Sequence, residues 1–231
     1  VGNVLVDHPD VPMISFTGSP PVGWGIRQRQ PRKHVALELG NSTPVIVEPD
    51  ADLETAARKL AASGFTHAGQ SCISVQRVYV HRDVHDRFAE LFVAAVEDLV
   101  VGDPMDEATQ VGPVIDAESR ERIMDWIDEA RRADAEVLAG AEVRDGLIRP
   151  TVLGGIDPAM KISCEEVFGP VVGMAPYSTV DEAIDLANSS PFGLQAGIFT
   201  GLPNRELSWA LRLHFVGVLV NVSPTLRADH L

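Results

Sequence analysis

Three things are scarce in this sequence: cysteine, positive charge and long apolar runs. The 231 residues include two cysteines, Cys72 and Cys164, which are too few for a disulfide framework. No apolar run approaches the roughly 20 residues of a membrane span, and no segment has the charged start and apolar centre of a signal peptide. Lysine and arginine number 19 against 33 aspartates and glutamates, and the formal charge of −14 repels nucleic acids and anionic membrane surfaces. We therefore expect a cytoplasmic protein without a nucleic-acid or membrane partner.

Hydrophobic residues make up 45% of the chain and aromatic residues 6%, which suits an ordinary α/β protein with one large or two small cores. Short apolar runs predict strands near 13–16, 35–39, 45–47, 75–80, 171–175, 196–200 and 216–220. Apolar residues at helical spacing predict helices near 22–30, after Asp52, and near 84–99, 117–132, 180–187 and 205–213. Because strand and helix alternate, we expect a mainly parallel sheet with helices on both faces.

The segment Gly69-Gln70-Ser71-Cys72 is a polar, glycine-containing turn between an expected helix and an expected strand. A thiolate nucleophile needs partial exposure and backbone N–H groups directed at it, and such a turn supplies both. The ordinary alternative is a small buried cysteine without chemistry. The polar neighbours favour Cys72 as a candidate nucleophile.

Residues Phe65-Thr66-His67-Ala68-Gly69-Gln70-Ser71-Cys72 resemble the cysteine motif of the NAD(P)-dependent aldehyde dehydrogenase superfamily. Three further segments agree with that family, in the same order: Phe16-Thr17-Gly18-Ser19, Leu37-Glu38-Leu39-Gly40 and Glu165-Glu166-Val167-Phe168-Gly169-Pro170. One short string of this kind matches many proteins by chance. Four in order, over essentially the whole chain, make a specific signal.

The resemblance implies two domains. Residues 1–40 would be the last β-α-β piece of a Rossmann-like dinucleotide-binding domain, and residues 41–231 the catalytic domain. Members of the family carry most of the dinucleotide-binding domain before the first motif, and continue past the last one into a terminal oligomerisation strand. The resemblance therefore predicts the second half of a longer enzyme, inactive as this fragment alone and a homo-oligomer when complete.

The resemblance also implies a mechanism. Cys72 would attack a small aldehyde, the thiohemiacetal would give hydride to NAD or NADP, and Glu38 would act as general base for hydrolysis of the thioester. The backbone N–H of Cys72 and a side-chain amide would stabilise the oxyanion. In the family that amide belongs to an asparagine upstream of the first motif, and neither Asn41 nor Asn221 matches it.

The resemblance places cofactor contacts on seven residues: Gly18, Ser19, Gly23, Leu39, Gly40, Glu166 and Phe168. Glycines at a strand-to-helix turn let a pyrophosphate approach backbone and a helix N-terminus. A carboxylate at Glu166 suits the two hydroxyls of a ribose, and the Phe168 ring suits a nicotinamide. The simpler alternatives are an ordinary turn at the first motif and an acidic strand end with a core phenylalanine at the last.

Several alternatives stay open. His67 could serve as base in a Cys–His hydrolase, although no third group nearby orients it. His81 and His85 are more typical of a helix start than of a metal site, so we expect no metal. A coenzyme-A acylating enzyme would not need Glu38, and a non-catalytic interaction domain remains possible for a fragment. Two departures from the family pattern stand out: Asn41 after Gly40, where a second glycine is usual, and the segment 221–226, where a more acidic and aromatic stretch is usual.

Overall fold

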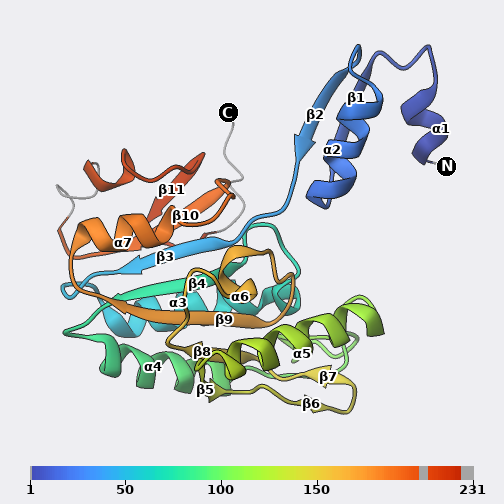
Figure 1. Ribbon diagram of the computed structural model, residues 1–231. Coiled ribbons are helices and arrows are strands. Elements are labelled where there is room, and N and C mark those ends of the chain that lie inside the picture. Colours follow the sequence, from blue (N-terminus) through green and yellow to red (C-terminus); the bar gives the residue numbers. More distant parts are fainter. Residues whose placement is uncertain (1, 203–207, 225–231) are drawn as a thin grey trace. The chain divides into compact units, whose positions relative to one another are not determined.

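The computed structural model describes residues 2–202 and 208–224, and the chain divides into two compact units (Figure 1). We refer to Val1–Gly40 as unit 1 and to Asn41–Leu231 as unit 2. The cofactor-binding and catalytic roles that the resemblance gives to residues 1–40 and 41–231 stay predictions.

Unit 1 consists of α1 (Gly2–Asp7), β1 (Met13–Thr17), α2 (Pro20–Arg29) and β2 (His34–Glu38). β1 and β2 pair in parallel, with Met13 beside His34 and Thr17 beside Glu38. The helix begins two residues before the predicted start, because the fixed φ of proline suits the first helical turn. The expected β-α-β arrangement is therefore present.

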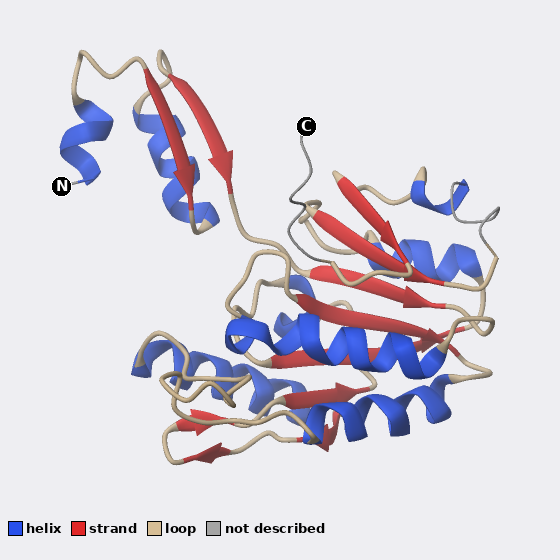
Figure 2. Cartoon of the chain, turned by 180° about the vertical axis from the view of Figure 1, so that it is seen from behind, coloured by secondary structure: helices blue, strands red, loops and turns tan. Residues whose placement is uncertain are grey.

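In the described part of unit 2, seven strands form one sheet in the order β11-β10-β3-β4-β9-β8-β5 (Figure 2). Their bounds are β3 Thr43–Val47, β4 Val75–His81, β5 Glu136–Ala139, β8 Thr151–Gly154, β9 Val171–Tyr177, β10 Gln195–Phe199 and β11 Gly217–Val220. Neighbouring strands are parallel except β5, which pairs antiparallel with β8. The mainly parallel sheet is confirmed.

Helices cover both faces of this sheet, as expected. α3 (Leu53–Phe65) and α4 (His85–Glu97) pack on one face, and α5 (Ala117–Arg132), α6 (Lys161–Cys164) and α7 (Val180–Ala187) lie on the other (Figure 2). Side chains alternate along a strand, so Val45 and Val47 of β3 join the first layer while Ile46 joins the second. Both layers are cores of buried aliphatic and aromatic side chains.

Capping residues explain why several predicted helices have the observed starts. The Asp52 carboxylate accepts a hydrogen bond from the Thr55 N–H at the start of α3, and Asp116 accepts one from Ser119 at the start of α5. The Thr179 hydroxyl accepts from the Glu182 N–H at the start of α7. Such side chains satisfy backbone donors that have no partner inside the helix.

The prediction missed the segment between α5 and α6. It folds as β5, β8 and a small hairpin of β6 (Val143–Arg144) and β7 (Leu147–Ile148). Strands of two to four residues are too short to show a clear period of two. The predicted helix at 205–213 lies partly outside the described residues, since 203–207 are not described and 208–210 are helical. Of the atypical segment 221–226, residues 225 and 226 also lie outside them.

Candidate active site

Cys72 lies in a turn between a short 3-10 helix, η1 (Thr66–Gly69), and strand β4. The residue is half-buried, which is the partial exposure that a nucleophile needs. Just before it, His67, Ala68 and Gly69 have φ angles of 54°, 54° and 69°. A left-handed backbone costs about 1–3 kcal/mol at a non-glycine residue and persists only where the surroundings hold it. The turn that carries Cys72 is therefore held in place by its neighbours.

One of those neighbours is the segment 165–170. A Cβ atom on Gly69 would lie 2.0 Å from the carbonyl oxygen of Gly169. No side chain fits in that space, so only glycine allows the approach. Two motifs that are distant in the sequence thus touch through backbone atoms.

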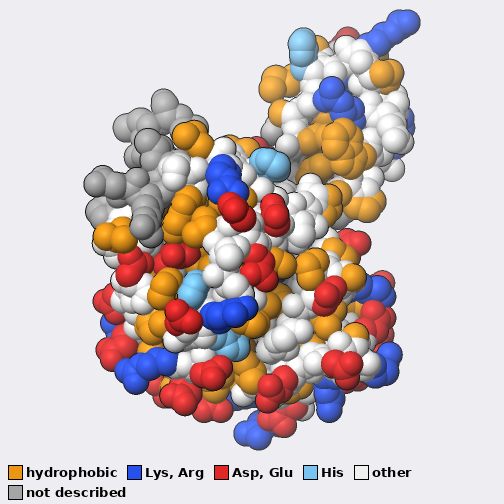
Figure 3. Space-filling model, turned by 60° about the vertical axis from the view of Figure 1, so that its left-hand side comes forward, with side chains coloured by type: hydrophobic (Ala, Val, Ile, Leu, Met, Phe, Trp, Pro, Cys, Tyr) orange, Lys and Arg blue, Asp and Glu red, His pale blue; other side chains and the backbone are white. Residues whose placement is uncertain are grey.

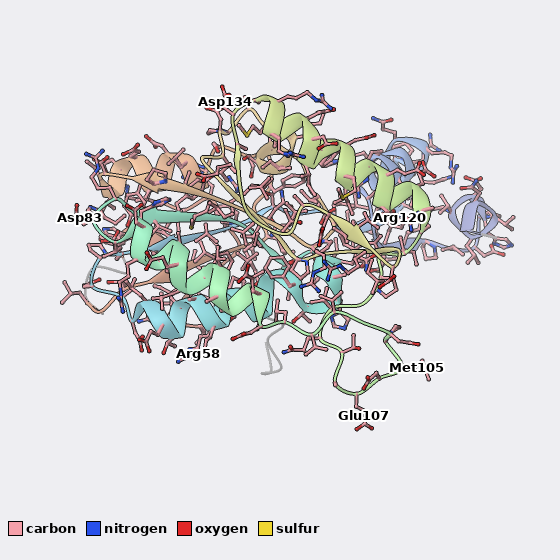
Figure 4. The ribbon with its side chains drawn as sticks, turned by 90° about the horizontal axis from the view of Figure 1, so that it is seen from below. Arg58, Asp83, Met105, Glu107, Arg120 and Asp134 are labelled. Atoms are coloured by element: carbon pink, nitrogen blue, oxygen red, sulfur yellow. The ribbon has the colours of Figure 1, made fainter. Side chains whose placement is uncertain are left out.

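Gln70 tethers the same turn on another side. Its Nε2 donates to the carbonyl oxygens of His67 (3.0 Å) and Pro113 (3.2 Å), and its Oε1 accepts from the Ile115 N–H (2.7 Å). Pro113 and Ile115 belong to the loop between α4 and α5, which carries the projecting side chains of Met105 and Glu107 in Figure 4. The glutamine therefore joins the cysteine turn to a surface loop.

The turn and the segment 165–170 share a small pocket of unit 2. Among the residues that line it are Asn41, Gly69, Ser71, Gln76, Glu166 and Phe168. Ser71 directly precedes Cys72 in the sequence. A larger pocket of about 420 Å³ lies between the loop 101–104 and the hairpin that carries Arg144, and none of the predicted site residues lines it.

Glu166 has a defined environment in this pocket. Its Oε1 accepts a hydrogen bond from the backbone N–H of Asn41 (2.9 Å). Burial raises the pKa of Glu166 above its ordinary value, while the Asn41 N–H and the charge of Arg122 act in the opposite direction. Arg122 also donates to the Val167 carbonyl oxygen (2.8 Å) and lies over the ring of Trp126. A carboxylate with one oxygen held in this way is an oriented hydrogen-bond acceptor.

Phe168 is not a core side chain, so that alternative is wrong. Its side chain is 40% exposed, and its φ of 48° is left-handed. The segment 165–170 is also not a strand end, because it forms the connection between α6 and β9. An exposed ring beside a carboxylate is a surface on which a flat ligand can stack.

The other predicted residues are in unit 1, where the chain places them at the carboxyl ends of β1 and β2. Gly18 follows β1 and donates its N–H to the Glu38 carbonyl oxygen (3.0 Å). Glu38 is the last residue of β2 and is exposed, and Leu39 and Gly40 follow it. A Cβ on Gly23 would lie 2.4 Å from the Leu39 side chain, so this glycine brings α2 close to the chain after β2. The candidate residues thus form two groups, one in each unit.

The start of α2 offers a limited set of donors to an anion. Ser19 precedes the helix, and its side chain makes no capping hydrogen bond there. Pro20 and Pro21 follow, and proline has no N–H to donate. An anion at this helix start would therefore depend on the hydroxyl and N–H of Ser19 and on the N–H of Val22.

The remaining sequence alternatives gain little. His67 is exposed, and His85 is the first residue of α4, as a helix start predicts. Within residues 2–202 and 208–224, no group of three or more potential ligand side chains is arranged to hold a metal ion. No helix of the described chain is long and apolar enough to cross a membrane. Acidic side chains are spread over the face of unit 2 that Figure 3 presents, consistent with the charge of −14.

Sequence reasoning gave no role to Gln70 or Gln76 and did not connect Asn41 with Glu166. Gln70 lies in the polar turn before Cys72, and Gln76 is a polar residue beside Val75 in a predicted apolar strand. Those signals mark the residues as unusual. Their partners become visible only when distant segments are brought together.

Comparison with known proteins identifies relatives along the whole chain. The model of the aldehyde dehydrogenase family matches residues 1–231. A 3-sulfolactaldehyde dehydrogenase of Priestia aryabhattai is 41% identical over 231 residues, which are 100% of this chain and 48% of that protein. A lactaldehyde dehydrogenase of Methanococcus maripaludis is 38% identical over 100% of this chain and 50% of its own. The chain therefore spans about half the length of these curated relatives.

Solved structures agree with the fold. The glyceraldehyde-3-phosphate dehydrogenase GapN of Methanocaldococcus jannaschii, complexed with NADP, superposes with a TM-score of 0.96 and 39% identity, over 100% of this chain and 50% of its own. A betaine aldehyde dehydrogenase of Staphylococcus aureus, in complex with NAD+, gives a TM-score of 0.94 and 33% identity, over 100% and 47%.

Proposed function

The chain belongs to the aldehyde dehydrogenase family, and from that premise we propose that it forms the cysteine-bearing part of an enzyme that oxidises an aldehyde to a carboxylic acid with NAD+ or NADP+. The observation that carries this proposal is the packing of the Cys72 turn against the segment that holds Glu166 and Phe168. Such a reaction needs a thiol to attack the aldehyde. It also needs groups that hold the cofactor, such as an oriented carboxylate and an exposed aromatic ring.

The chemistry of Cys72 begins with attack of its thiolate on the carbonyl carbon, which forms a C–S bond and places negative charge on the former carbonyl oxygen. Backbone N–H groups of the turn can stabilise that oxyanion. NAD+ or NADP+, when bound, supplies the acceptor for the hydride that leaves the carbon. Loss of hydride converts the thiohemiacetal into a thioester on Cys72.

Glu38 then acts in hydrolysis. Its carboxylate takes a proton from water, the resulting hydroxide adds to the thioester carbon, and the Cys72 thiolate leaves as the C–S bond breaks. One aldehyde and one water yield one carboxylic acid and one proton, which Glu38 passes to solvent, and the hydride has left earlier. Glu38 is an exposed residue at the end of a strand, where its side chain is free to meet solvent water.

The residues present fit a dinucleotide. Glu166 is an acceptor suited to the two hydroxyls of a ribose, because one of its oxygens is fixed by the Asn41 N–H. Phe168 offers an exposed ring for stacking. In unit 1 the Ser19 hydroxyl, beside Gly18, is the natural partner of a phosphate oxygen at the start of α2.

The proposal is tested by replacing Cys72 with alanine in the full-length gene product, with Cys164→Ala as the matched control. Both cysteines are half-buried, so each substitution removes the same atoms from a similar environment. Formation of NADH or NADPH is followed with lactaldehyde, 3-sulfolactaldehyde, glyceraldehyde-3-phosphate, betaine aldehyde and benzaldehyde. We expect Cys72→Ala to lose at least about 10³-fold in kcat, since it removes the nucleophile.

Cys164→Ala should retain most of the activity, and both variants should keep the wild-type circular dichroism spectrum. Aldehyde oxidation by Cys72→Ala at more than a few per cent of the wild-type rate would show that the thiol is not the nucleophile.

A further inference from the structure

Gln76, the second residue of β4, makes an unusual set of contacts. Its side chain is 5% exposed and follows Cys72 by four residues in the sequence. Nε2 donates to the carbonyl oxygens of Ile162 (2.9 Å) and Glu165 (2.7 Å), and Oε1 accepts from the N–H of Val167 (2.9 Å). One buried carboxamide therefore binds three backbone groups of the segment 162–167.

The chemistry of these contacts requires a glutamine. Two carbonyl oxygens need donors and one N–H needs an acceptor, which a carboxamide satisfies in one orientation only. Glutamate lacks the donors, and methionine lacks both functions. Asparagine is one methylene shorter. The site is thus matched to the length and the polarity of this side chain.

The three contacts bracket Glu166. The Glu165 carbonyl and the Val167 N–H belong to the two residues that flank it, so both are fixed relative to β4. β4 begins three residues after Cys72. Gln76 therefore sets where the Glu166 backbone lies relative to the strand that continues from the cysteine turn.

The next residue of β4 anchors the other partner of Glu166. Arg77 is fully buried, and its Nη2 donates to the Ser42 carbonyl oxygen (2.8 Å). Ser42 follows Asn41, whose N–H holds the Glu166 carboxylate. The Ser42 hydroxyl also donates to the Ser163 carbonyl oxygen (3.2 Å), beside the residues that Gln76 binds. Two neighbouring residues of β4 therefore position Glu166: Gln76 holds its backbone, and Arg77 holds the segment that binds its carboxylate.

We propose that Gln76 is a positioning residue: its carboxamide fixes the 165–167 backbone against β4 and so holds Glu166 and Phe168 at the pocket that they share with the cysteine turn. This inference rests on the proposed function, because it concerns the binding of NAD+ or NADP+ at that pocket. Gln76 acts through Glu166 and Phe168, because both polar atoms of its carboxamide are bonded to backbone groups of the segment 162–167.

The test compares Gln76→Met with Thr151→Val in the full-length gene product. Thr151 of β8 is fully buried, and its hydroxyl donates to the Arg149 carbonyl oxygen (2.8 Å) and accepts from the Ala141 N–H (2.9 Å). Each substitution nearly preserves shape and leaves buried backbone groups without side-chain partners. Thr151 does not line the shared pocket, so its variant reports the general cost of such a loss.

Three quantities are measured: the Kd for NAD+ and NADP+ by calorimetric titration, the melting temperature, and the rate of Cys72 alkylation by iodoacetamide without cofactor. We expect Gln76→Met to raise the cofactor Kd about tenfold. Thr151→Val should leave the Kd within about twofold of wild type. Alkylation should change little in either variant, because Gln70 ties the turn to Pro113 and Ile115, which lie outside the segment that Gln76 binds.

A second variant and a mutant cycle separate positioning from general packing. In Gln76→Glu, a protonated carboxyl can donate one hydrogen bond and accept another, so the Kd should return toward wild type between about pH 8.5 and about pH 6. The ratio of the Kd of Gln76→Met to the wild-type Kd should stay the same at both pH values. The double variant Gln76→Met/Glu166→Gln should lose less cofactor-binding free energy than the sum of the losses in the two single variants, because Gln76 acts through Glu166.

The outcomes are distinct. If Gln76→Met lowers only the melting temperature, as Thr151→Val does, while the cofactor Kd is unchanged, Gln76 is a packing residue and the inference is wrong. If Gln76→Met does not fold, the test uses Gln76→Glu alone. A cofactor Kd equal to the wild-type Kd at both pH values would then overturn the positioning role of Gln76. If the wild-type protein binds neither NAD+ nor NADP+, the proposed function itself fails.

Discussion

The two units of this chain use parallel strands in different ways. In unit 2, β3 is buried at every position and β4 at all but its last, between two layers of helices. In unit 1, β1 and β2 alternate between exposed and half-buried residues and pair with each other alone among the described residues. Parallel strands are stable when both faces are covered. Unit 2 meets that condition with its own helices, and unit 1 does not.

This difference divides the chemistry. The candidate nucleophile and the residues that hold Glu166 belong to unit 2, whose sheet is covered on both faces. The candidate base and the residues expected to contact phosphate belong to unit 1. Segments with few buried apolar contacts open locally at low free-energy cost. We therefore expect the cysteine turn to keep its conformation without a ligand. The strands of unit 1 that carry Glu38 should become more protected when a ligand covers them.

The largest effect that the comparison predicts is in hydrogen exchange of the 231-residue chain. Amides of β4 should exchange at least about 10³-fold more slowly than amides of β1 and β2, because β4 opens only with its whole sheet. Mass spectrometry of proteolytic fragments measures both regions in one experiment. Equal protection of the two regions would show that the strands of unit 1 are as stable against opening as the sheet of unit 2.

The second prediction concerns the backbone contact at Gly69. Gly69→Ala should lower the free energy of unfolding by about 3 kcal/mol, since it adds a steric clash with Gly169 to the cost of a left-handed alanine. Gly155 is the matched control, because its φ of 66° is also left-handed but a Cβ atom added there would meet no atom within 4 Å. Gly155→Ala should cost about 1 kcal/mol.

Urea unfolding of the two variants gives the difference. If both lose the same amount, the contact between the cysteine turn and Gly169 contributes nothing beyond local backbone strain, and the shared pocket is not held together as described.

The smallest predicted effect is on pH dependence. Because burial raises the pKa of Glu166 in the folded state, its contribution to stability is fully present below its ordinary pKa near 4.5 and is lost as the pH rises through the raised value. Relative to Glu166→Gln, the wild-type protein should therefore become less stable as the pH rises from about 4 to about 7. Urea unfolding at several pH values measures this.

Glu165→Gln is the control, because Glu165 is the exposed neighbour of Glu166. A difference between wild type and Glu166→Gln that does not change with pH would contradict the assigned cause of the shift.

Much of this architecture follows from local sequence, and the rest depends on contacts across the fold. Asp116 and Thr179 mark the starts of α5 and α7, so both helices have the predicted bounds. The antiparallel edge at β5 and β8 was missed, because its strands are short. The position of Cys72 in a turn follows from its flanking residues. The role of Gln76 does not, since its three partners lie in a segment that the sheet alone brings beside it.

The left-handed Phe168 marks a similar limit. Its neighbours in the sequence suit an acidic strand end with a buried ring, whereas the ring is exposed and its backbone is left-handed, directly before the Gly169 that approaches Gly69. Local pattern cannot show such a conformation, because the residue itself disfavours it.

In the proposed mechanism, Cys72 carries an acyl group that Glu38 helps to hydrolyse. Its most direct test is mass spectrometry of full-length Glu38→Gln protein, quenched in acid after mixing with an aldehyde substrate and NAD+ or NADP+. We expect a burst of reduced cofactor, then slow turnover, and an acyl mass increase on the peptide that contains Cys72. A protein without the adduct, an adduct on Cys164, or steady turnover at the wild-type rate would contradict it.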